Sequence, residues 1–323
     1  MSRLRGRDAC WCGSGRHFGD CHGNWAASQR TPQRPGHLSP LRPVPKSVAR
    51  PSYAMGRRIS SFAGPQIAIG GMRKRLRHAG RVAADVLVAV GAKVRPGITT
   101  DELDAIAHEA YVSRGAYPST LNYRGYPKSI CTSVNEVICH GIPDDHTLRE
   151  GDIVSVDVTA FIDGVHGDTC GTFCVGEVDE PTRALVEGTR LAALAGIAAV
   201  AAGRPLDVIG QAVQGVADAR GLGVVEDYGG HGIGAIFHAA PHVSHHRGAP
   251  GSAWPMPKDL VITVEPMLDA GTVRHHDWEN GWTVVTDDLL PSAQFEHTVI
   301  VGEDGAEIMT LTRDGASAVG LPD

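Results

Sequence analysis

The sequence has no apolar run approaching the roughly 20 residues of a membrane-spanning helix, and no apolar stretch follows its basic start at residues 1–11. It also lacks a strong excess of either charge, with a formal net charge of −6 and an isoelectric point of about 6.2. We therefore expect no secretory signal, no membrane partner and no general attraction to nucleic acid. With 323 residues, 42% of them hydrophobic, the chain can bury one large core or two modest ones.

Cysteine is scarce, and the seven cysteines are an odd number that argues against a framework of disulfides. We therefore expect a reducing compartment and a cytoplasmic protein. Three of the cysteines and a histidine lie close together near the start, at Cys10, Cys12, Cys21 and His22. Three thiolates and one imidazole are the ligands of a closed structural zinc site. Residues 1–30 are thus predicted to form a zinc-binding motif whose folding depends on the metal.

The next stretch, residues 31–65, is rich in proline and has little apolar periodicity. Its seven prolines predict an extended linker, partly polyproline II, with too little apolar content to dock firmly on a neighbouring domain. From residue 66 the pattern becomes globular, and residues 66–323 are expected to form one catalytic domain.

Within this domain, helices and strands are expected in mixed order, which favours an α+β fold. Helices are predicted at 72–94, at 99–114 with Thr99 or Thr100 as its cap, at 181–202 and at 206–220. Strands are predicted at 130–139, 153–162 and 165–175, and again from residue 224 onward.

A predicted hairpin brings two aspartates together. Asp163-Gly164 between two apolar runs is typical of a type I′ turn, so Ile162 should oppose Val165. In that register Asp157 and Asp168 are diagonal neighbours on one face, roughly 7–8 Å apart at the backbone. Two carboxylates aimed at one buried point require a proton or a cation.

Further ligand types follow along the chain. Glu265 ends an apolar strand, Glu296 precedes another, and His231 lies among glycines that let the backbone approach closely. Four carboxylates and one imidazole suit manganese, iron, cobalt or zinc. Two divalent ions would neutralise four carboxylates, which indicates a dinuclear site of the kind that activates water in hydrolysis.

Two short echoes indicate an internal duplication. Residues 152–157 resemble residues 259–265, each ending a buried strand with a carboxylate, and His140-Gly141-Ile142 resembles His231-Gly232-Ile233. The two echoes occur in the same order, which favours two related halves facing one site.

The same motifs, in order and spacing, resemble those of the type I methionine aminopeptidases over about residues 65–312. They include residues 133–143, the hairpin aspartates, residues 230–238, Thr263-Val264-Glu265-Pro266-Met267 and residues 293–297. The resemblance implies the pita-bread fold, in which two pseudo-symmetric halves surround a dinuclear metal centre. It implies removal of the initiator methionine from nascent proteins when the second residue is small.

The resemblance also implies roles for individual residues. Ligands of two divalent ions (cobalt, manganese, iron or zinc) would be Asp157, Asp168, His231, Glu265 and Glu296. Catalytic residues would be His140, His238 and Glu265. Substrate would contact Tyr123, Tyr126, Cys131, His140, Phe237, His238 and Trp282. Positions that hold a monovalent cation in some relatives are Asn135, Val137 and Ser292.

The amino-terminal cluster resembles the zinc motif at the carboxyl end of the bacterial preprotein translocase motor. Arginines at positions 3, 5, 7 and 16 make it basic, so ribosome docking is one hypothesis and a zinc motif without a partner is the other. The expected partners are nascent polypeptide N-termini, and the expected state is a monomer without a membrane contact.

Two other functions compete with methionine removal. A proline-specific aminopeptidase of the same fold uses the same five ligands, but such relatives usually carry a large extra amino-terminal domain. A metal-free binding protein on this fold is expected to lose ligands, whereas all five are present here.

Overall fold

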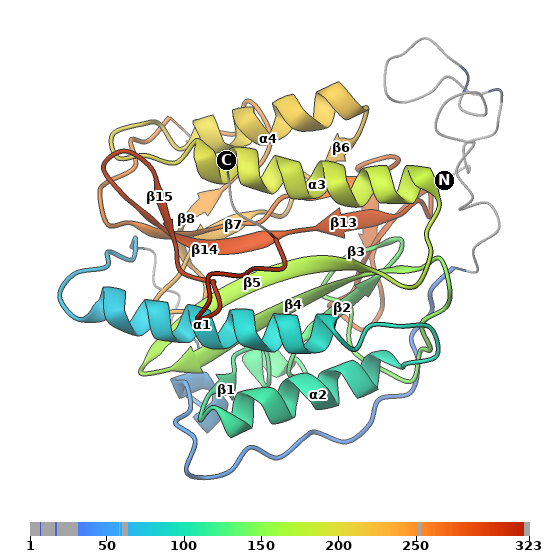
Figure 1. Ribbon diagram of the computed structural model, residues 1–323, viewed down its shortest axis with the longest axis horizontal. Helices are drawn as coiled ribbons and strands as arrows, with labels where there is room; N and C mark the ends of the chain where they lie inside the picture. The colour runs from blue at the N-terminus through green and yellow to red at the C-terminus, as the bar shows by residue number, and fades with distance from the viewer. Residues whose placement is uncertain are drawn as a thin grey trace.

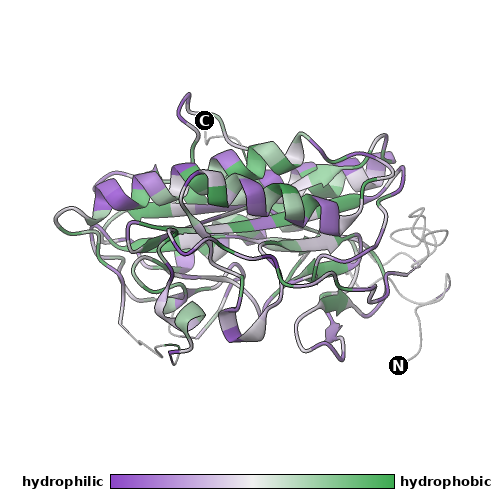
Figure 2. Ribbon diagram, turned by 90° about the horizontal axis from the view of Figure 1, so that it is seen from below, coloured by the Kyte–Doolittle hydropathy of each residue, from purple (hydrophilic) through white to green (hydrophobic). Residues whose placement is uncertain are grey.

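A computed structural model describes residues 7, 17, 32–57, 59, 64–250 and 253–319. In these residues the fold is a large curved sheet with four α-helices on one face, as Figure 1 and Figure 2 show. Among the helices of this described part, none is long and apolar enough to cross a membrane. The predicted α+β class is confirmed.

The four helices form two pairs, one over each half of the sheet (Figure 1). Helix α1 (Met72–Gly91) lies beside α2 (Thr100–Ser113), and α3 (Glu180–Ala198) lies beside α4 (Asp207–Arg220). Of the two predicted caps, Thr99 is the one that caps α2, and it forms a capping box with Glu102. Helix α3 ends four residues earlier than expected.

The main sheet has the order β1-β4-β5-β14-β9-β7-β8, with β2 paired to β4 and β15 to β14. The pair β5–β14 joins the two halves, so each half contributes its longest strands to the centre of the molecule. The strands of this sheet are β1 (Tyr117–Pro118), β2 (Cys131–Val134), β4 (Ile153–Ile162), β5 (Val165–Cys174), β7 (Gly230–Gly232), β8 (Ala239–Val243), β9 (Val261–Val264), β14 (Glu296–Val301) and β15 (Ala306–Ile308).

Two three-stranded sheets complete the fold, in the orders β13-β10-β6 and β11-β12-β3. Their strands are β3 (Val137–Cys139), β6 (Gly223–Val224), β10 (Met267–Asp269), β11 (His275–Asp277), β12 (Val284–Thr286) and β13 (Ser292–Gln294). The prediction of a single strand at 130–139 is wrong. It divides into β2 and β3 at Asn135, whose φ of 52° turns the chain out of the extended conformation.

Helix α1 lies very close to the sheet next to the predicted site. A Cβ on Gly167 of β5 would lie 2.5 Å from the backbone nitrogen of Gly80 in α1, so only a glycine allows this approach. Buried side chains of α1, among them Val82, Val86 and Val90, pack against β4 and β5 in the core. This packing fixes the strand that carries Asp168.

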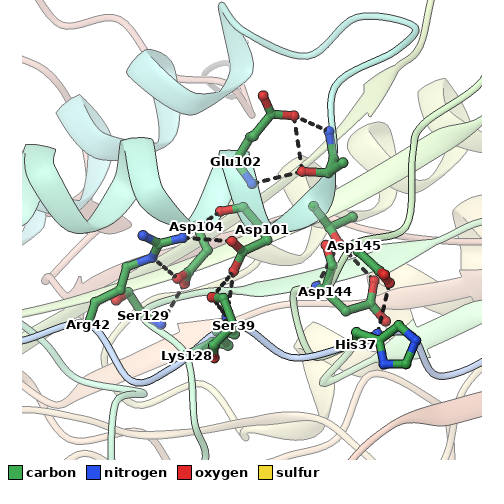
Figure 3. A network of polar contacts seen from close by, with 12 residues as sticks. His37, Ser39, Arg42, Asp101, Glu102, Asp104, Lys128, Ser129, Asp144 and Asp145 are labelled. Carbon is green, nitrogen blue, oxygen red and sulfur yellow. Dashed lines mark hydrogen bonds and ion pairs between the residues drawn. The ribbon is translucent and has the colours of Figure 1, made fainter.

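The N-terminal segment, defined here as residues 32–57, is docked on the catalytic domain, and the expectation of an undocked linker is wrong for it. Carboxylates of the domain accept from its backbone amides, with Gly36 donating to Asp144 and His37 donating to Asp145. Figure 3 shows this network, in which Arg42 and Ser39 also reach helix α2. This part of the docking is polar, so apolar periodicity could not predict it.

Apolar contacts anchor the rest of this segment. Val44 and Val48 are buried against Tyr117, Leu121 and Phe161 of the catalytic domain. The 3₁₀ helix η4 (Ser52–Met55) follows and places Tyr53 against the domain. The predicted zinc ligands Cys10, Cys12, Cys21 and His22 lie outside the described residues.

Candidate active site

The β4–β5 hairpin has the predicted register. Ile162 opposes Val165 and Asp157 opposes Cys170, and the turn residues Asp163 and Gly164 have φ values of 55° and 77°. Asp168 therefore lies two residue pairs along from Asp157, on the same face, and pairs with Thr159. The Thr159 hydroxyl donates to Asp168 at 2.7 Å and orients that carboxylate toward the cavity.

The second half supplies His231, Glu265 and Glu296, from β7, the end of β9 and the start of β14. Glu296 opposes Cys170 across β5–β14, which sets it beside the hairpin aspartates. Thr263 accepts from the backbone N–H of His231 at 2.9 Å and donates to Glu265 at 2.6 Å. One threonine thus orients two of the predicted ligands.

The glycines around His231 act as the sequence suggests. A Cβ on Gly230 would collide with the Thr263 carbonyl, and one on Gly232 would collide with the Ala240 carbonyl. The His231 Nδ1–H donates to the Gly232 carbonyl at 3.1 Å. In the neutral ring this leaves the Nε2 lone pair free, the arrangement found for metal-binding histidines.

The ligand atoms converge without touching. His231 Nε2 lies 3.8 Å from Asp168 Oδ2 and 3.6 Å from Glu265 Oε1. Ligand atoms of Asp168, His231 and Glu296 all lie within 4.8 Å of one another. These separations are too long for hydrogen bonds and are consistent with a shared cation between the groups.

Burial disfavours charge on all four carboxylates. It raises the pKa of Asp157 to about 6 and that of Glu265 to about 8, and it raises the pKa of Asp168 and of Glu296 well above the usual range. For Asp168 the neighbouring Asp157 adds to this effect. Each carboxylate therefore needs a positive partner in order to be ionised at neutral pH.

That partner is not an arginine or a lysine. Over the described ranges, the ion pairs of these four carboxylates involve His231 alone. Burial lowers the pKa of His231 to about 4, so its ring is neutral near pH 7. In the same part of the chain, one buried oxygen of Asp157 and one of Glu296 have no hydrogen-bond partner. The donor set therefore fits divalent metal ions.

The five predicted ligands line a cavity of about 300 Å³. The predicted substrate-contacting side chains line the same cavity: Tyr123, Tyr126, Cys131, His140, Phe237, His238 and Trp282. The structure thus brings together residues separated by more than 170 positions in the sequence. Their predicted individual roles remain predictions.

One wall of the cavity is aromatic and rigid. The Tyr126 hydroxyl lies within hydrogen-bonding distance of the Ile130 and Gly141 carbonyls, and the Tyr126 ring meets Trp282 edge-on with centroids 5.1 Å apart. Such a wall suits an apolar, flexible side chain.

Two histidines face the cavity. Burial lowers the pKa of His140 to about 4 and the pKa of His238 well below its usual value, so both rings are neutral near pH 7. His140 has a φ of 57°, which is uncommon outside glycine and is often found at functional sites. His238 Nδ1 lies 3.1 Å from the Tyr123 hydroxyl.

Several cavity residues were not predicted: Thr120, Arg124, Cys139, Tyr228, Gly229, Met267 and Gln294. Gln294 donates to Glu265 Oε2 at 3.3 Å and so orients a predicted ligand. Gln294 precedes Glu296 by two residues within the motif at residues 293–297. Its place in that motif could therefore have identified it as a cavity residue. No comparable signal indicated Thr120 or Tyr228.

The residues predicted for a monovalent cation lie outside the cavity lining. The Ser292 backbone N–H donates to the Asn135 carbonyl at 2.9 Å, which brings β13 against the turn between β2 and β3. Val137 begins β3 on the other side of that turn. The three positions are adjacent, and their predicted role stays a prediction.

Comparison with known proteins gives two family matches. Metallopeptidase family M24 matches residues 74–303, and the SEC-C motif matches residues 7–24. "Methionine aminopeptidase 2" of Mycobacterium tuberculosis is 48% identical over 281 residues, covering 87% of this chain and 98% of the relative. The SEC-C match overlaps the predicted zinc ligands, which lie outside the described residues.

Solved structures agree. The methionine aminopeptidase of Rickettsia prowazekii is similar with a TM-score of 0.74 and 42% identity, covering 77% of this chain and 100% of that one. The prolidase of Pyrococcus furiosus is similar with a TM-score of 0.62 and 20% identity, covering 76% of this chain and 66% of that one. The second likeness shows a shared fold alone.

Proposed function

The chain belongs to metallopeptidase family M24, and from this premise we propose that it is a methionine aminopeptidase. It is a metallo-aminopeptidase with the pita-bread fold, and it removes N-terminal methionine. The observation that carries the proposal is the single cavity in which four carboxylates, one neutral histidine and an aromatic wall meet.

The five ligands would hold two divalent ions, with Asp168 and Glu296 shared between them because both lie between the halves. When bound, the ions would activate a water molecule and polarise the scissile carbonyl. Cobalt, manganese, iron and zinc all suit this oxygen-rich set with one imidazole.

Glu265 would also serve as the proton carrier. With the ions bound, the Glu265 carboxylate would be the base that accepts a proton from the activated water. Thr263 and Gln294 contact its two oxygens and fix the carboxylate relative to the cavity. Because a carrier must accept a proton and deliver it from one position, this double anchoring favours the role.

The neutral histidines would act on the substrate backbone. Each neutral ring has one N–H, which can donate to an amide oxygen as negative charge develops there. His238 would donate to the scissile carbonyl oxygen, and His140 would contact the amide beyond it. Both rings are at the cavity surface beside aromatic side chains, where little water competes for these hydrogen bonds.

The pocket also accounts for substrate choice. Tyr126, Trp282 and Cys131 offer an apolar, polarisable surface for a thioether side chain. The second residue of the substrate would lie among His140, the metal ligands and the pocket wall. We infer that only a small second residue fits there, because about 300 Å³ must hold the methionine as well.

Two alternatives are less well supported. A proline-specific activity rests on likenesses of about 20% identity, which carry the fold and nothing more. A metal-free binding role gives no reason for four buried carboxylates that lack basic partners in the described part of the chain.

We also propose that residues 1–30 bind structural zinc through Cys10, Cys12, Cys21 and His22, supported by the SEC-C match. The basic end would dock on ribosomes in the cytoplasm, where nascent N-termini emerge. Changing Cys10 and Cys12 to serine should release this zinc and reduce ribosome co-sedimentation without changing peptide hydrolysis. Co-sedimentation that is unaffected would exclude the docking proposal.

We further propose that residues 66–323 act as the catalytic domain of a monomer, and that Asn135, Val137 and Ser292 hold a monovalent cation. Light scattering after size exclusion should give the mass of one 34.1 kDa chain. Potassium or sodium should raise the melting temperature of the wild type more than that of Ser292→Pro, which changes the backbone at that position.

The central test is amino-acid release from peptides with added manganese or cobalt. Methionine should be released from Met-Gly, Met-Ala and Met-Ser starts, and Met-Lys and Met-Phe starts should be rejected. Release of alanine from Ala-Pro peptides would favour the proline-specific alternative instead. Equal turnover of all Met-X peptides would show that the pocket is not limited as argued.

A further inference from the structure

We propose that Tyr53, from the N-terminal segment, is a positioning residue that holds Tyr123 and through it aligns His238. The inference rests on the proposed function, because His238 matters only if the cavity cleaves peptides. It makes the N-terminal segment a part of the active site, although none of its residues lines the cavity.

The hydroxyl of Tyr53 is anchored to the catalytic domain. It donates to the Ser119 carbonyl, and the Ser119 backbone N–H donates in turn to the Thr159 carbonyl of β4. Thr159 is the residue whose hydroxyl orients Asp168. The Tyr53 hydroxyl is therefore linked through Ser119 to β4, the strand that carries the predicted ligand Asp157, so its position follows that of the catalytic centre.

The ring of Tyr53 supports Tyr123 directly. The two ring centroids are 5.1 Å apart with the planes at 80°, an edge-to-face contact. The Tyr123 ring lies nearly parallel to His238 on another side, with centroids 5.1 Å apart, and its hydroxyl is 3.1 Å from His238 Nδ1. Tyr123 is thus placed between Tyr53 and the histidine.

The backbone around Tyr123 explains why it needs support. Asn122 and Arg124, the residues on either side, have φ values of 62° and 49°, in the left-handed region that few residues other than glycine adopt. Such conformations persist only where surrounding contacts hold them. In the described structure, the Tyr53 ring is one of the contacts that cover this turn.

The alignment matters for the proton on His238. In its neutral form the ring carries one N–H, and its Nδ1 lies beside the Tyr123 hydroxyl. If the Tyr123 hydroxyl donates to Nδ1, the hydrogen must lie on Nε2, where it can donate to a substrate carbonyl. A displaced Tyr123 would allow the other tautomer, which has no N–H at Nε2.

The test uses full-length, metal-loaded enzyme and a Met-Ala-Ser peptide. Tyr53→Ala should lower kcat about tenfold and change KM less than threefold, because a donor to the developing oxyanion acts mainly in the transition state. Tyr53→Phe keeps the ring and should retain at least half of the wild-type kcat. Met55→Ala is the matched control, since Met55 is in the same 3₁₀ helix with its side chain 55% exposed.

A double-mutant cycle identifies the route. Tyr123→Phe removes the hydroxyl beside His238 and should lower kcat about as much as Tyr53→Ala. In Tyr123→Phe enzyme, the further change Tyr53→Ala should lower kcat less than twofold, because both act through one hydrogen bond. If the double variant instead lowered kcat by the product of the two single decreases, Tyr53 would not act through Tyr123. That result would overturn the proposal.

Other outcomes are equally decisive. Equal kcat for Tyr53→Ala and Met55→Ala would also overturn it. If Tyr53→Ala does not fold, Tyr53→Leu fills the space without an aromatic edge and should show the same loss of kcat. Failure of the wild type to release methionine would refute the proposed function instead, so the two failures are distinguishable.

Discussion

Two groups of carboxylates in this fold meet opposite conditions. In the cavity, Asp168 and Glu296 are buried with no arginine or lysine paired to them in the described structure. Beneath the N-terminal segment, Asp101 and Asp104 bind Arg42, and Lys128 also bonds Asp101 (Figure 3). The cavity carboxylates therefore lack basic partners, whereas those beneath the N-terminal segment have them.

The pKa values follow burial as well as these partners. Burial raises the pKa of every carboxyl group in the cavity. Burial alone would raise the pKa of Asp101 too, but its hydrogen bonds to Lys128 and Ser39 lower it below the usual range. Asp104 is more deeply buried, and burial raises its pKa despite Arg42. Aspartates thus contribute to the predicted metal site in the cavity, and in α2 they join the N-terminal segment to the catalytic domain.

The largest effect should come from Asp168→Asn. Loss of a ligand that two ions share should lower kcat/KM strongly. The decrease should exceed the roughly 100-fold that follows the loss of a group hydrogen-bonded to a ligand. Methionine release and calorimetric metal binding would measure this loss. The metal-free variant should unfold at no lower urea concentration than the wild type, because burial already favours the neutral form of Asp168, which asparagine resembles.

Asp304→Asn is the matched control, since Asp304 is exposed and distant from the cavity lining. It should keep both activity and metal affinity. Full activity of Asp168→Asn at saturating metal would remove the basis for a shared ligand.

The second effect should fall on stability rather than activity. Lys128 is 1% exposed and donates to Asp101 and Ser39, so Lys128→Met leaves a partly buried carboxylate with one partner fewer. The free energy of unfolding should fall by about 2 kcal/mol, with kcat changed less than twofold. Urea unfolding of metal-loaded protein would measure the loss.

Lys93→Met changes the same atoms at an exposed site and should leave the unfolding free energy within about 0.5 kcal/mol of the wild type. If Lys128→Met lost activity in proportion to stability, the two groups of carboxylates would not be as separate as their contacts suggest.

The smallest effect concerns pH. Glu265 and Asp269 each have a folded pKa of about 8, above the usual value, because both are buried. Their carboxyl groups therefore take up protons between pH 9 and pH 7 in the folded protein but not in the unfolded protein. The metal-free enzyme should gain about 1 kcal/mol of unfolding free energy from each group as pH falls through this window. Histidines do not oppose the change there, because in the unfolded chain they gain protons only near pH 6.5.

Saturating manganese should reduce this pH dependence, since bound metal replaces the proton. Asp101 should not contribute, because its lowered pKa keeps it ionised in both states across the window. Urea unfolding at three pH values, with chelator and with manganese, would measure both. A stability that rises with pH in the metal-free enzyme would contradict the direction given for Glu265.

The sequence by itself determined the features that depend on near neighbours. The Asp163-Gly164 turn fixed the hairpin register, and with it the relation of Asp157 to Asp168, because strand pairing has a period of two. The capping box of Thr99 and Glu102 was equally local. The motif residues were recognised one by one, and the described structure places all the predicted active-site positions on one cavity.

Only the tertiary structure decided what the N-terminal segment does. Its proline pattern predicts an extended chain but is silent about docking and about the 3₁₀ helix η4. The partners of Gly36, Arg42 and Tyr53 lie 59 or more residues away, and most are polar groups that leave no apolar periodicity. Such contacts depend on how α2 and the Ser119 turn are packed, because a hydrogen bond or ring contact exists only once both partners have been brought into place.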